Sequence, residues 1–382
     1  MLEHAYELTR DRLIAIEQAV AARGDEVALY IVYDRPSRVA ERAGLFRTHF
    51  AERCLPDAVL DRMIGAFRAV GAHVELFVGE QAFLAALADG GIERSRRPLS
   101  VVYNGIGWGI GVDAFEPGRK ALVPAVADSY RLLCTGSDAY VSALTLHKYH
   151  SFLVLRALGV RTSEVWHYRA GEGWVGASPK AGTKVIVKST YEAWSVGVTD
   201  ESVFVVDASC DERVDAIAEA IGQPVTVQKF VSGTEVSVPV VSCPDRLVLP
   251  PMRQSLARAP NDAEAFTTID DSMTSGSLAF TPLQEPEALV AELRHTAARV
   301  CDIFQMRAAG RIDFRVDEDG LPWVTDVAID PGWSTTGSAF ASFATLGVDH
   351  PSFLRMLIGV TFAWAGALPL TDADRAATRA SS

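Results

Sequence analysis

Two carboxylates, Asp313 and Asp326, are the residues of this sequence best placed to do chemistry, because a predicted β-hairpin sets them opposite each other. An alternating apolar run over 312–316 forms the first strand. The stretch 317–320 (Asp-Glu-Asp-Gly) forms the turn, and a second run over 321–327 returns. With the turn in that place, the two carboxylates face each other across the hairpin.

The charged neighbours of these carboxylates favour a cation site. Side chains alternate along a strand, so Arg311, Asp313 and Arg315 share one face and the apolar side chains of the same strand share the other. Carboxylate oxygens of this kind suit Mg²⁺ that bridges nucleotide phosphates. The solvated face of a surface hairpin explains these residues about as well. The rest of the chain has to decide between the two interpretations.

Length and composition indicate an ordinary globular protein of two or three domains. The chain has 382 residues, of which 49% are hydrophobic and 22% charged, and its formal net charge is −12. A negative balance argues against a nucleic-acid partner, which normally requires a basic face. It does not argue against ATP, because a few lysines and Mg²⁺ hold phosphates on an acidic protein.

Cysteine usage and hydropathy indicate a cytoplasmic protein. The five cysteines are scattered, odd in number and without a CxxC motif, which is typical of buried thiols in a reducing compartment. The N-terminal stretch 1–26 is a charged amphipathic helix without a signal-peptide core. No apolar run reaches the ~18 residues that span a bilayer, so we expect no membrane association. The nearest run, 353–370, is interpreted as a buried helix that ends in a loop.

The first third of the chain alternates strands and helices, which predicts an open parallel α/β sheet. Strands are expected at Val27–Tyr33, His73–Val78, 100–104 and 132–135, and helices over 41–70 and Glu80–Ala88. The loop 104–111 (Asn-Gly-Ile-Gly-Trp-Gly-Ile-Gly) lacks the G-x-G-x-x-G spacing of a dinucleotide fingerprint. We interpret it as a mobile loop at a strand end.

From 133 onward the pattern changes to a capped helix followed by short strands. Ser137 or Asp138 caps a helix predicted over 139–158, on which His147 and His150 lie three residues apart. Without a third ligand they are interpreted as surface histidines rather than a metal site. Strands are then expected at 165–168, 185–188, 204–206, 225–230 and 235–241, with helices over 211–221 and 285–305. The polar stretch between 250 and 281 is read as a lid or a disordered loop.

Four stretches resemble the D-alanine–D-alanine ligase branch of the ATP-grasp superfamily. They are 135–152 (TGSDAYVSALTLHKYHSF), 185–197 (VIVKSTYEAWSVG), 227–238 (VQKFVSGTEVSV) and 310–333 (GRIDFRVDEDG…TDVAIDPGW). Their order and spacing match the family over more than half of the chain.

The resemblance implies a three-domain ATP-grasp fold of α/β and α+β parts. An N-terminal α/β domain covers 1–132, a small α+β central lobe 133–228, and an α+β C-terminal lobe 229–382 carries the metal site and a lid. The family's first domain suggests a homodimer, which nothing in the residues themselves supports.

The resemblance also implies the roles of particular residues. Lys148 and Lys188 bind α- and β-phosphates, and the loop at Ser195 folds over the γ-phosphate. Gln228, Lys229 and Val231 lie at the adenine, and Glu235 binds the ribose. Asp313 and Asp326 carry Mg²⁺, with Mn²⁺ as an alternative, and Arg311 with the Gly332 N–H stabilises a tetrahedral oxyanion. The activity implied is ADP-forming ligation of a carboxylate to an amine through an acyl phosphate.

Departures from the family pattern fall mainly on the substrate side. Ala328 replaces a metal-binding asparagine, so Asp330 is a candidate compensating ligand, and one or two metals remain open. The bulky residues Tyr191, Trp194 and Trp333, with Ser334 after them, suggest a larger or flatter substrate than D-alanine. The small molecules expected are therefore a carboxylate, such as another amino acid, and an amine. A cyclising ligase, a carboxylate kinase and a non-catalytic nucleotide-binding module remain alternatives.

Overall fold

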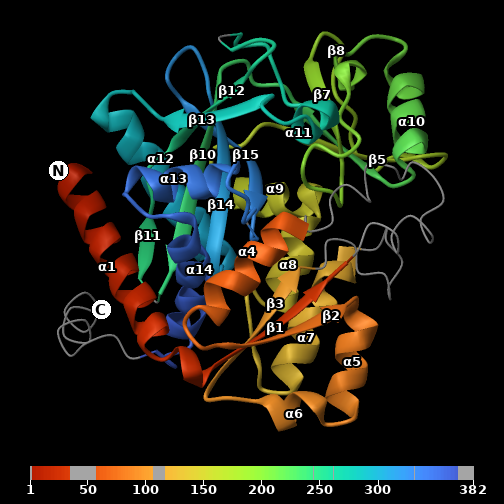
Figure 1. Ribbon diagram of the computed structural model, residues 1–382. Helices are drawn as coiled ribbons and strands as arrows, with labels where there is room; N and C mark the ends of the chain where they lie inside the picture. The colour runs from red at the N-terminus through yellow and green to blue at the C-terminus, as the bar shows by residue number, and fades with distance from the viewer. Residues whose placement is uncertain are drawn as a thin grey trace.

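A parallel sheet forms the N-terminal part of the protein, as the strand spacing predicts (Figure 1). The computed structural model describes residues 2–34, 57–105, 117–243, 245–260, 262–330 and 332–368. The strand order is β2 (His73–Val78), β1 (Val27–Tyr33), β3 (Leu99–Gly105) and β4 (Leu133–Cys134), and all three pairings are parallel. The central strand β1 is buried along its whole length.

Successive side chains of β1 point to opposite faces of the sheet and belong to two separate hydrophobic cores. Leu29 and Ile31 point to one face, where α1 (Leu2–Ala22) and α4 (Asp57–Arg68) pack. Tyr30 and Val32 point to the other, which is covered by α5 (Glu80–Ala88), α6 (Gly91–Ser95) and α7 (Leu122–Ser129). The short 3₁₀ helices η1 (Gly24–Glu26) and η2 (Pro117–Ala121) precede β1 and α7.

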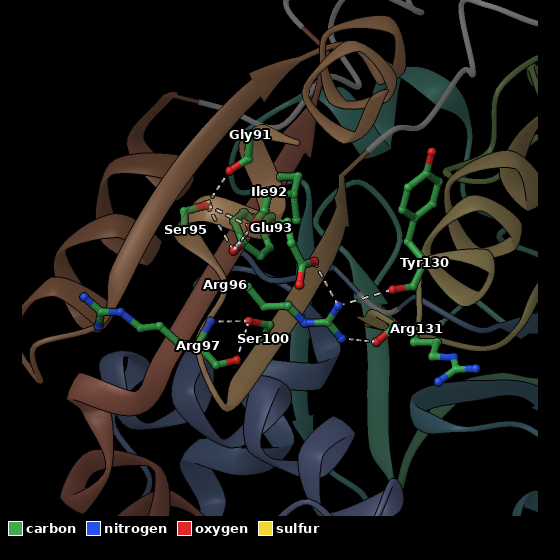
Figure 2. A network of polar contacts seen from close by, with 10 residues as sticks. Gly91, Ile92, Glu93, Ser95, Arg96, Arg97, Ser100, Tyr130 and Arg131 are labelled. Atoms are coloured by element: carbon green, nitrogen blue, oxygen red, sulfur yellow. Dashed lines mark hydrogen bonds and ion pairs between the residues drawn. The ribbon is translucent and has the colours of Figure 1, made fainter. Parts of the chain in front are cut away.

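A network of polar contacts joins the connection between α6 and β3 to the residues that follow α7 (Figure 2). The Arg96 guanidinium donates to the carbonyl oxygens of Tyr130, at 3.4 Å, and Arg131, at 2.6 Å. Ser100 and Arg97 exchange two hydrogen bonds at the start of β3. The connection from α6 to β3 is thereby tied to the end of α7, which holds β4 beside β3.

The central lobe is an antiparallel sheet covered by one helix, as predicted. Its strand order is β6 (Gly173–Trp174), β5 (Val165–Arg169), β9 (Val225–Lys229), β7 (Lys184–Ser189) and β8 (Val203–Val205). The helix α10 (Cys210–Ile221) buries its apolar side against this sheet. The 3₁₀ helix η3 (Asp200–Ser202) leads into β8.

The C-terminal sheet contains the predicted hairpin and lies beside the central lobe (Figure 1). Its order is β13 (Leu278–Pro282), β12 (Met252–Leu256), β10 (Thr234–Ser242), β14 (Ala308–Val316) and β15 (Pro322–Ala328), and β11 (Arg246–Val248) pairs with β10. The apolar face of β14, with Ile312 and Phe314 fully buried, packs under α12 (Glu287–Phe304). The predicted face assignment of the hairpin is confirmed.

Several element predictions need correction. The helix expected over 139–158 is two helices, α8 (Ala139–Leu146) and α9 (Lys148–Ala157), because His147 leaves the helical conformation at φ −82° and ψ 87°. Asp138, not Ser137, caps α8 by accepting from the Val141 N–H at 2.9 Å. The stretch 253–277 is not irregular, since it contains most of β12 and the short helix α11 (Ile269–Met273). Parts of the predicted 41–70 helix and 104–111 loop lie outside the described residues.

The C-terminal helices pack against the N-terminal domain rather than forming a separate layer. Here α13 (Ser338–Thr345) leads into α14 (His350–Trp364), and α14 shares one hydrophobic core with α1, α4 and the N-terminal sheet. α1 and α14 approach closely because Gly359 has no side chain. A Cβ built there would lie 2.5 Å from Ile16 Cγ2 and 3.0 Å from Val20 Cγ2. Among the described helices, none is long and apolar enough to cross a bilayer.

Two helical glycines give a matched test of this crossing. Gly359→Ala should lower the free energy of unfolding by about 1–3 kcal/mol through overpacking, less the gain in helix propensity. Gly65→Ala in α4 should raise it by up to ~1 kcal/mol, because a Cβ at Gly65 meets nothing within 4 Å. Denaturant unfolding of both variants measures the difference, and equal shifts would contradict the close packing of α1 on α14.

Candidate functional site

Three neighbouring strands carry the charged face that the sequence predicted. In the register of the sheet, Asp313 on β14 lies opposite Asp326 on β15 and opposite Ser237 on β10. Glu235 on β10 lies opposite Arg315 on β14. A register shift directly after Asp313 marks a bulge. The charged side chains of this face line one cavity of about 630 Å³ between the two lobes and the N-terminal domain.

Arg311 and Asp313 form a bidentate ion pair within this face. Arg311 Nε and Nη2 donate to Asp313 Oδ1 and Oδ2, both at 2.7 Å, and the Ser237 hydroxyl donates to Oδ1 at 2.8 Å. The Asp313 charge raises the pKa of Arg311 despite the opposing effect of burial. An ionised carboxylate has about four lone-pair positions, so Asp313 keeps one on Oδ2 for a further ligand.

Asp326 is held as an anion by the predicted lysines. Burial by itself would raise the pKa of Asp326, but the positive charges of Lys148, Lys188 and Arg311 outweigh burial and lower it. Burial lowers the pKa of Lys188, and the charges of Asp326 and Glu235 oppose that effect. The two lysines and two aspartates that sequence reasoning selected therefore lie in one electrostatic environment.

The residues predicted to lie at the adenine line the same cavity. Gln228, Lys229 and Val231 all border it, as does Glu235. Gln228 is only 1% exposed, and its Nε2 has no hydrogen-bond partner in the part of the chain that the structure describes. A buried amide donor without a partner is costly, so this atom is ready for a ligand acceptor. The stretch 253–277 adds further lining residues, including Phe266 and Met273.

The loop after β7 is held in a strained conformation. Trp194 and Ser195 adopt φ values of 59° and 58°, which side chains other than glycine rarely adopt. The Ser189 hydroxyl donates to the Val196 carbonyl at 2.9 Å, and the Val198 N–H donates to the Ser195 carbonyl at 2.9 Å. Strain of this kind persists only where the surrounding contacts impose it, and it is common at ligand-binding loops.

Glu192, which sequence reasoning missed, fixes this loop from below. Its carboxylate accepts from Arg119 Nη2 at 2.8 Å and from Gln223 Nε2 at 2.8 Å, and its carbonyl accepts from Lys148 Nζ. The side chains of Arg119 and Glu192 are 1% and 0% exposed. This buried ion pair links the N-terminal domain to the loop after β7. No spacing in the sequence connects residues 73 positions apart, so only the fold reveals it.

The opposite end of the cavity is lined by Gly332, Trp333 and Ser334. Trp333 packs against Tyr103 with ring centroids 4.3 Å apart and the rings tilted by 55°. Trp194 reaches across from the central lobe, its Cζ2 3.9 Å from the position of a Cβ on Gly332. Tyr191 does not line the cavity, since its ring packs edge-on against His147 at 5.2 Å.

Asp330 lies at this end and is not gathered with the other two aspartates into a metal cluster. It pairs with Lys120 Nζ at 3.0 Å, a lysine that sequence reasoning also missed. Among the described residues, no group of three or more His, Cys, Asp or Glu side chains could hold a metal ion. A metal at Asp313 and Asp326 would therefore complete its shell with phosphate oxygens and water.

Of the two histidines interpreted as surface residues, His150 is exposed, whereas His147 is buried. His147 is 7% and His167 3% exposed, and His147 stacks on His150 with ring centroids 3.6 Å apart. Burial lowers the pKa of His147 to about 3 and that of His167 to about 4, and the neighbouring histidines lower both further. The cluster is therefore neutral near pH 7. The four described cysteines are free thiols whose pKa values burial raises, so none is an activated nucleophile.

The antiparallel central lobe, the C-terminal sheet and the buried lysines between them define an ATP-grasp ligase, an ATP-dependent enzyme. Residues 163–359 match the family model described as D-ala D-ala ligase C-terminus. This match covers more than half of the chain, and the chain belongs to that family.

Individual relatives agree with this assignment. A D-alanine–D-alanine ligase of Dechloromonas aromatica is 26% identical over 244 residues, which are 63% of this chain and 76% of the relative. One from Anaeromyxobacter dehalogenans is 28% identical over 246 residues, 63% of this chain and 75% of that protein. The crystal structure of the Bacillus anthracis D-alanine–D-alanine ligase complexed with ATP superposes with a TM-score of 0.64 at 16% identity, covering 88% of this chain and 97% of that one. This likeness confirms the fold.

The neutral histidine cluster gives a prediction for acid stability. The folded pKa values of His147 and His167 lie below the ordinary value of 6.5, so the unfolded chain binds more protons between pH 6.5 and about 4. The contribution of these two neutral histidines to the free energy of unfolding is fully present above pH 6.5, and it is lost as the pH falls through this window. His167→Gln should lower the steepness of that loss, measured as thermal midpoint against pH. The exposed His295→Gln is the control and should leave the slope unchanged. A His167→Gln slope equal to that of the wild type would mean that His167 does not contribute.

Proposed function

We propose that the protein is an ADP-forming carboxylate–amine ligase that makes an amide bond through an acyl phosphate. The observation that supports this best is the opposed pair Asp313 and Asp326, whose charges face Lys148 and Lys188 inside one cavity. Carboxylates for a divalent cation and ammonium groups for phosphates are the parts that phosphoryl transfer requires. Gly332 and Arg311 line the same cavity, where an acyl group would react.

The residues divide the reaction between them. Lys148 and Lys188 hold the phosphates while the substrate carboxylate attacks the γ-phosphorus in line, which breaks the bond to ADP. The amine then attacks the acyl carbon, and inorganic phosphate leaves from the tetrahedral intermediate. Arg311 and the Gly332 N–H donate to the oxyanion of that intermediate. Trp194 and the strained loop keep water from the acyl phosphate.

Mg²⁺, or Mn²⁺ in its place, fits the donor set at Asp313 and Asp326. Both are carboxylates in register, Asp326 has a lowered pKa, and Asp313 retains a lone pair beyond its contacts with Arg311 and Ser237. When bound, the ion would neutralise phosphate charge. Asp330 is left out of the proposed metal shell because it pairs with Lys120.

The substrates are proposed to be an amino acid and an amine. The relatives are named for D-alanine itself, so D-alanine must be tested alongside other amino acids. Trp194 and Trp333 at the acyl end of the cavity support a flatter or larger donor, whereas Tyr191 is turned away from the cavity. A cytoplasmic location and a homodimer stay predictions.

Phosphate release from Mg-ATP, measured against amino acids singly and in pairs with mass detection of products, tests the reaction. We expect release that requires two substrates and a product lighter by one water than their sum. Release with one acid alone would indicate a cyclising ligase or a carboxylate kinase. ATP binding without release for any pair would contradict the proposal and favour a non-catalytic module.

Asp313→Asn tests the metal assignment. It should raise the Mg²⁺ concentration for half-maximal turnover at least about tenfold, because the amide is a weaker ligand and disturbs the contact with Arg311. Asp319→Asn in the exposed hairpin turn is the control and should leave the Mg²⁺ dependence unchanged. An unchanged Mg²⁺ requirement in Asp313→Asn would remove Asp313 from the metal site.

A further inference from the structure

The pair of Asp330 and Lys120 has no role in the reaction described so far, although both residues line the active cavity. Lys120 belongs to η2 in the N-terminal domain and Asp330 follows β15 in the C-terminal lobe. Lys120 Nζ lies 3.0 Å from Asp330 Oδ2. The Lys120 side chain is 10% exposed and that of Asp330 is 49% exposed. The lysine is therefore the buried holder, and the carboxylate is the end that a ligand can reach.

The hydrogen bonding of Asp330 leaves one oxygen available. Lys120 occupies Oδ2, and Oδ1 accepts no hydrogen bond from any described part of the chain. A carboxylate whose orientation is fixed through one oxygen presents the other in a defined direction, which suits an N–H donor of a ligand.

Aromatic side chains line the same cavity as this carboxylate. Burial raises the pKa of Tyr103, and the charge of Asp330 raises it further, so the two side chains are close enough to interact. Tyr103 packs against Trp333, and Trp194 of the central lobe approaches Gly332. An acid among aromatic rings is a favourable environment for a substituted ammonium group, since ring faces attract cations and ring surfaces bury the attached carbon atoms.

The place of Asp330 in the chain relates it to the reacting atoms. It stands two residues before Gly332, whose N–H is proposed to bind the oxyanion at the acyl carbon. In an α-amino acid the ammonium nitrogen is only two bonds from that carbon. A group that binds the α-ammonium must therefore be a near neighbour of the oxyanion donor, as Asp330 is.

From these contacts we infer that Asp330 is the counter-ion for the α-ammonium group of the acyl donor, and that Lys120 positions it. The inference rests on the proposed ligase function and names its donor class, an α-amino acid. α-Hydroxy acids and simple carboxylic acids of the same shape would leave Oδ1 without a donor, so they should be poor substrates and poor ligands.

Two measurements test this with defined probes. In the first, alanine, leucine, phenylalanine and lysine of both configurations are compared with the α-hydroxy acids of the same side chains, with hydroxylamine trapping the acyl phosphate as a hydroxamate. In the second, binding of the same compounds is followed by ligand-observed NMR, which needs no turnover. The wild type should prefer the amino acid of at least one pair by about 30-fold or more in both measurements.

Asp330→Asn should abolish most of this preference in KM and in binding, with the KM for ATP unchanged. Lys120→Met should weaken amino-acid binding but keep the preference, because the carboxylate remains. Asp302→Asn removes an exposed carboxylate that pairs with Arg246 away from the cavity, and this control should behave as wild type.

The outcomes separate this inference from the proposed function. Binding that prefers amino acids and depends on Asp330, without hydroxamate from any probe, would support the inference and contradict the ligase. Equal use or binding of hydroxy acids by the wild type would overturn the inference. So would an Asp330→Asn variant that keeps the preference, or one whose only change is a higher Mg²⁺ requirement, which would make Asp330 a metal ligand.

Discussion

The register that sets Asp313 opposite Asp326 is the constraint on which the rest of this site depends. Two buried carboxylates repel each other and lose hydration, so the pair persists only with compensating cations. Arg311 supplies one through a bidentate contact, and Lys148 and Lys188 supply two more from the central lobe. Because those lysines come from α9 and β7, the C-terminal sheet can be charged in this way only when the central lobe stands over it.

A second buried ion pair, between Arg119 and Glu192, joins the central lobe to the N-terminal domain. Arg119 and Glu192 are almost completely buried, and breaking such a pair leaves an uncompensated charge, which costs several kcal/mol. The Glu192 carboxylate also accepts from Gln223, and its backbone carbonyl accepts from Lys148 Nζ, so one residue joins the N-terminal domain, Lys148 and the base of the strained loop. The left-handed conformations of Trp194 and Ser195 are maintained by this anchoring. These contacts fix the loop after β7, which lines the cavity, to the N-terminal domain.

Local pattern was sufficient to predict what depends on neighbours in the chain. Alternation around residues 312–327 predicts the hairpin, its faces and the opposed aspartates, and the continuous apolar run of β1 predicts a buried parallel strand. The four motif stretches were sufficient to predict the family. The failures have physical causes. His147, where the helix is interrupted, packs against His167 and Tyr191, which are distant in the sequence. Lys120 and Arg119 contact partners 210 and 73 positions away. β12 and β13 are short strands of five residues each without a clear alternation of polar and apolar residues, so pattern alone does not predict them.

In the proposed reaction, Arg311 serves both the ground state and the tetrahedral intermediate, and its hydrogen bonding is compatible with both. A guanidinium has five N–H donors in a fixed plane, and two of them are committed to Asp313. Arg311 and Gly332 line the same cavity, so in the proposed reaction the remaining donors can serve an oxyanion without loss of the contact with Asp313. Its raised pKa keeps it charged throughout. A donor fixed before the charge develops needs no reorganisation at the moment of reaction, which is the main advantage of a preorganised site. The carboxylate that lies opposite Asp326 thus also fixes the orientation of the arginine.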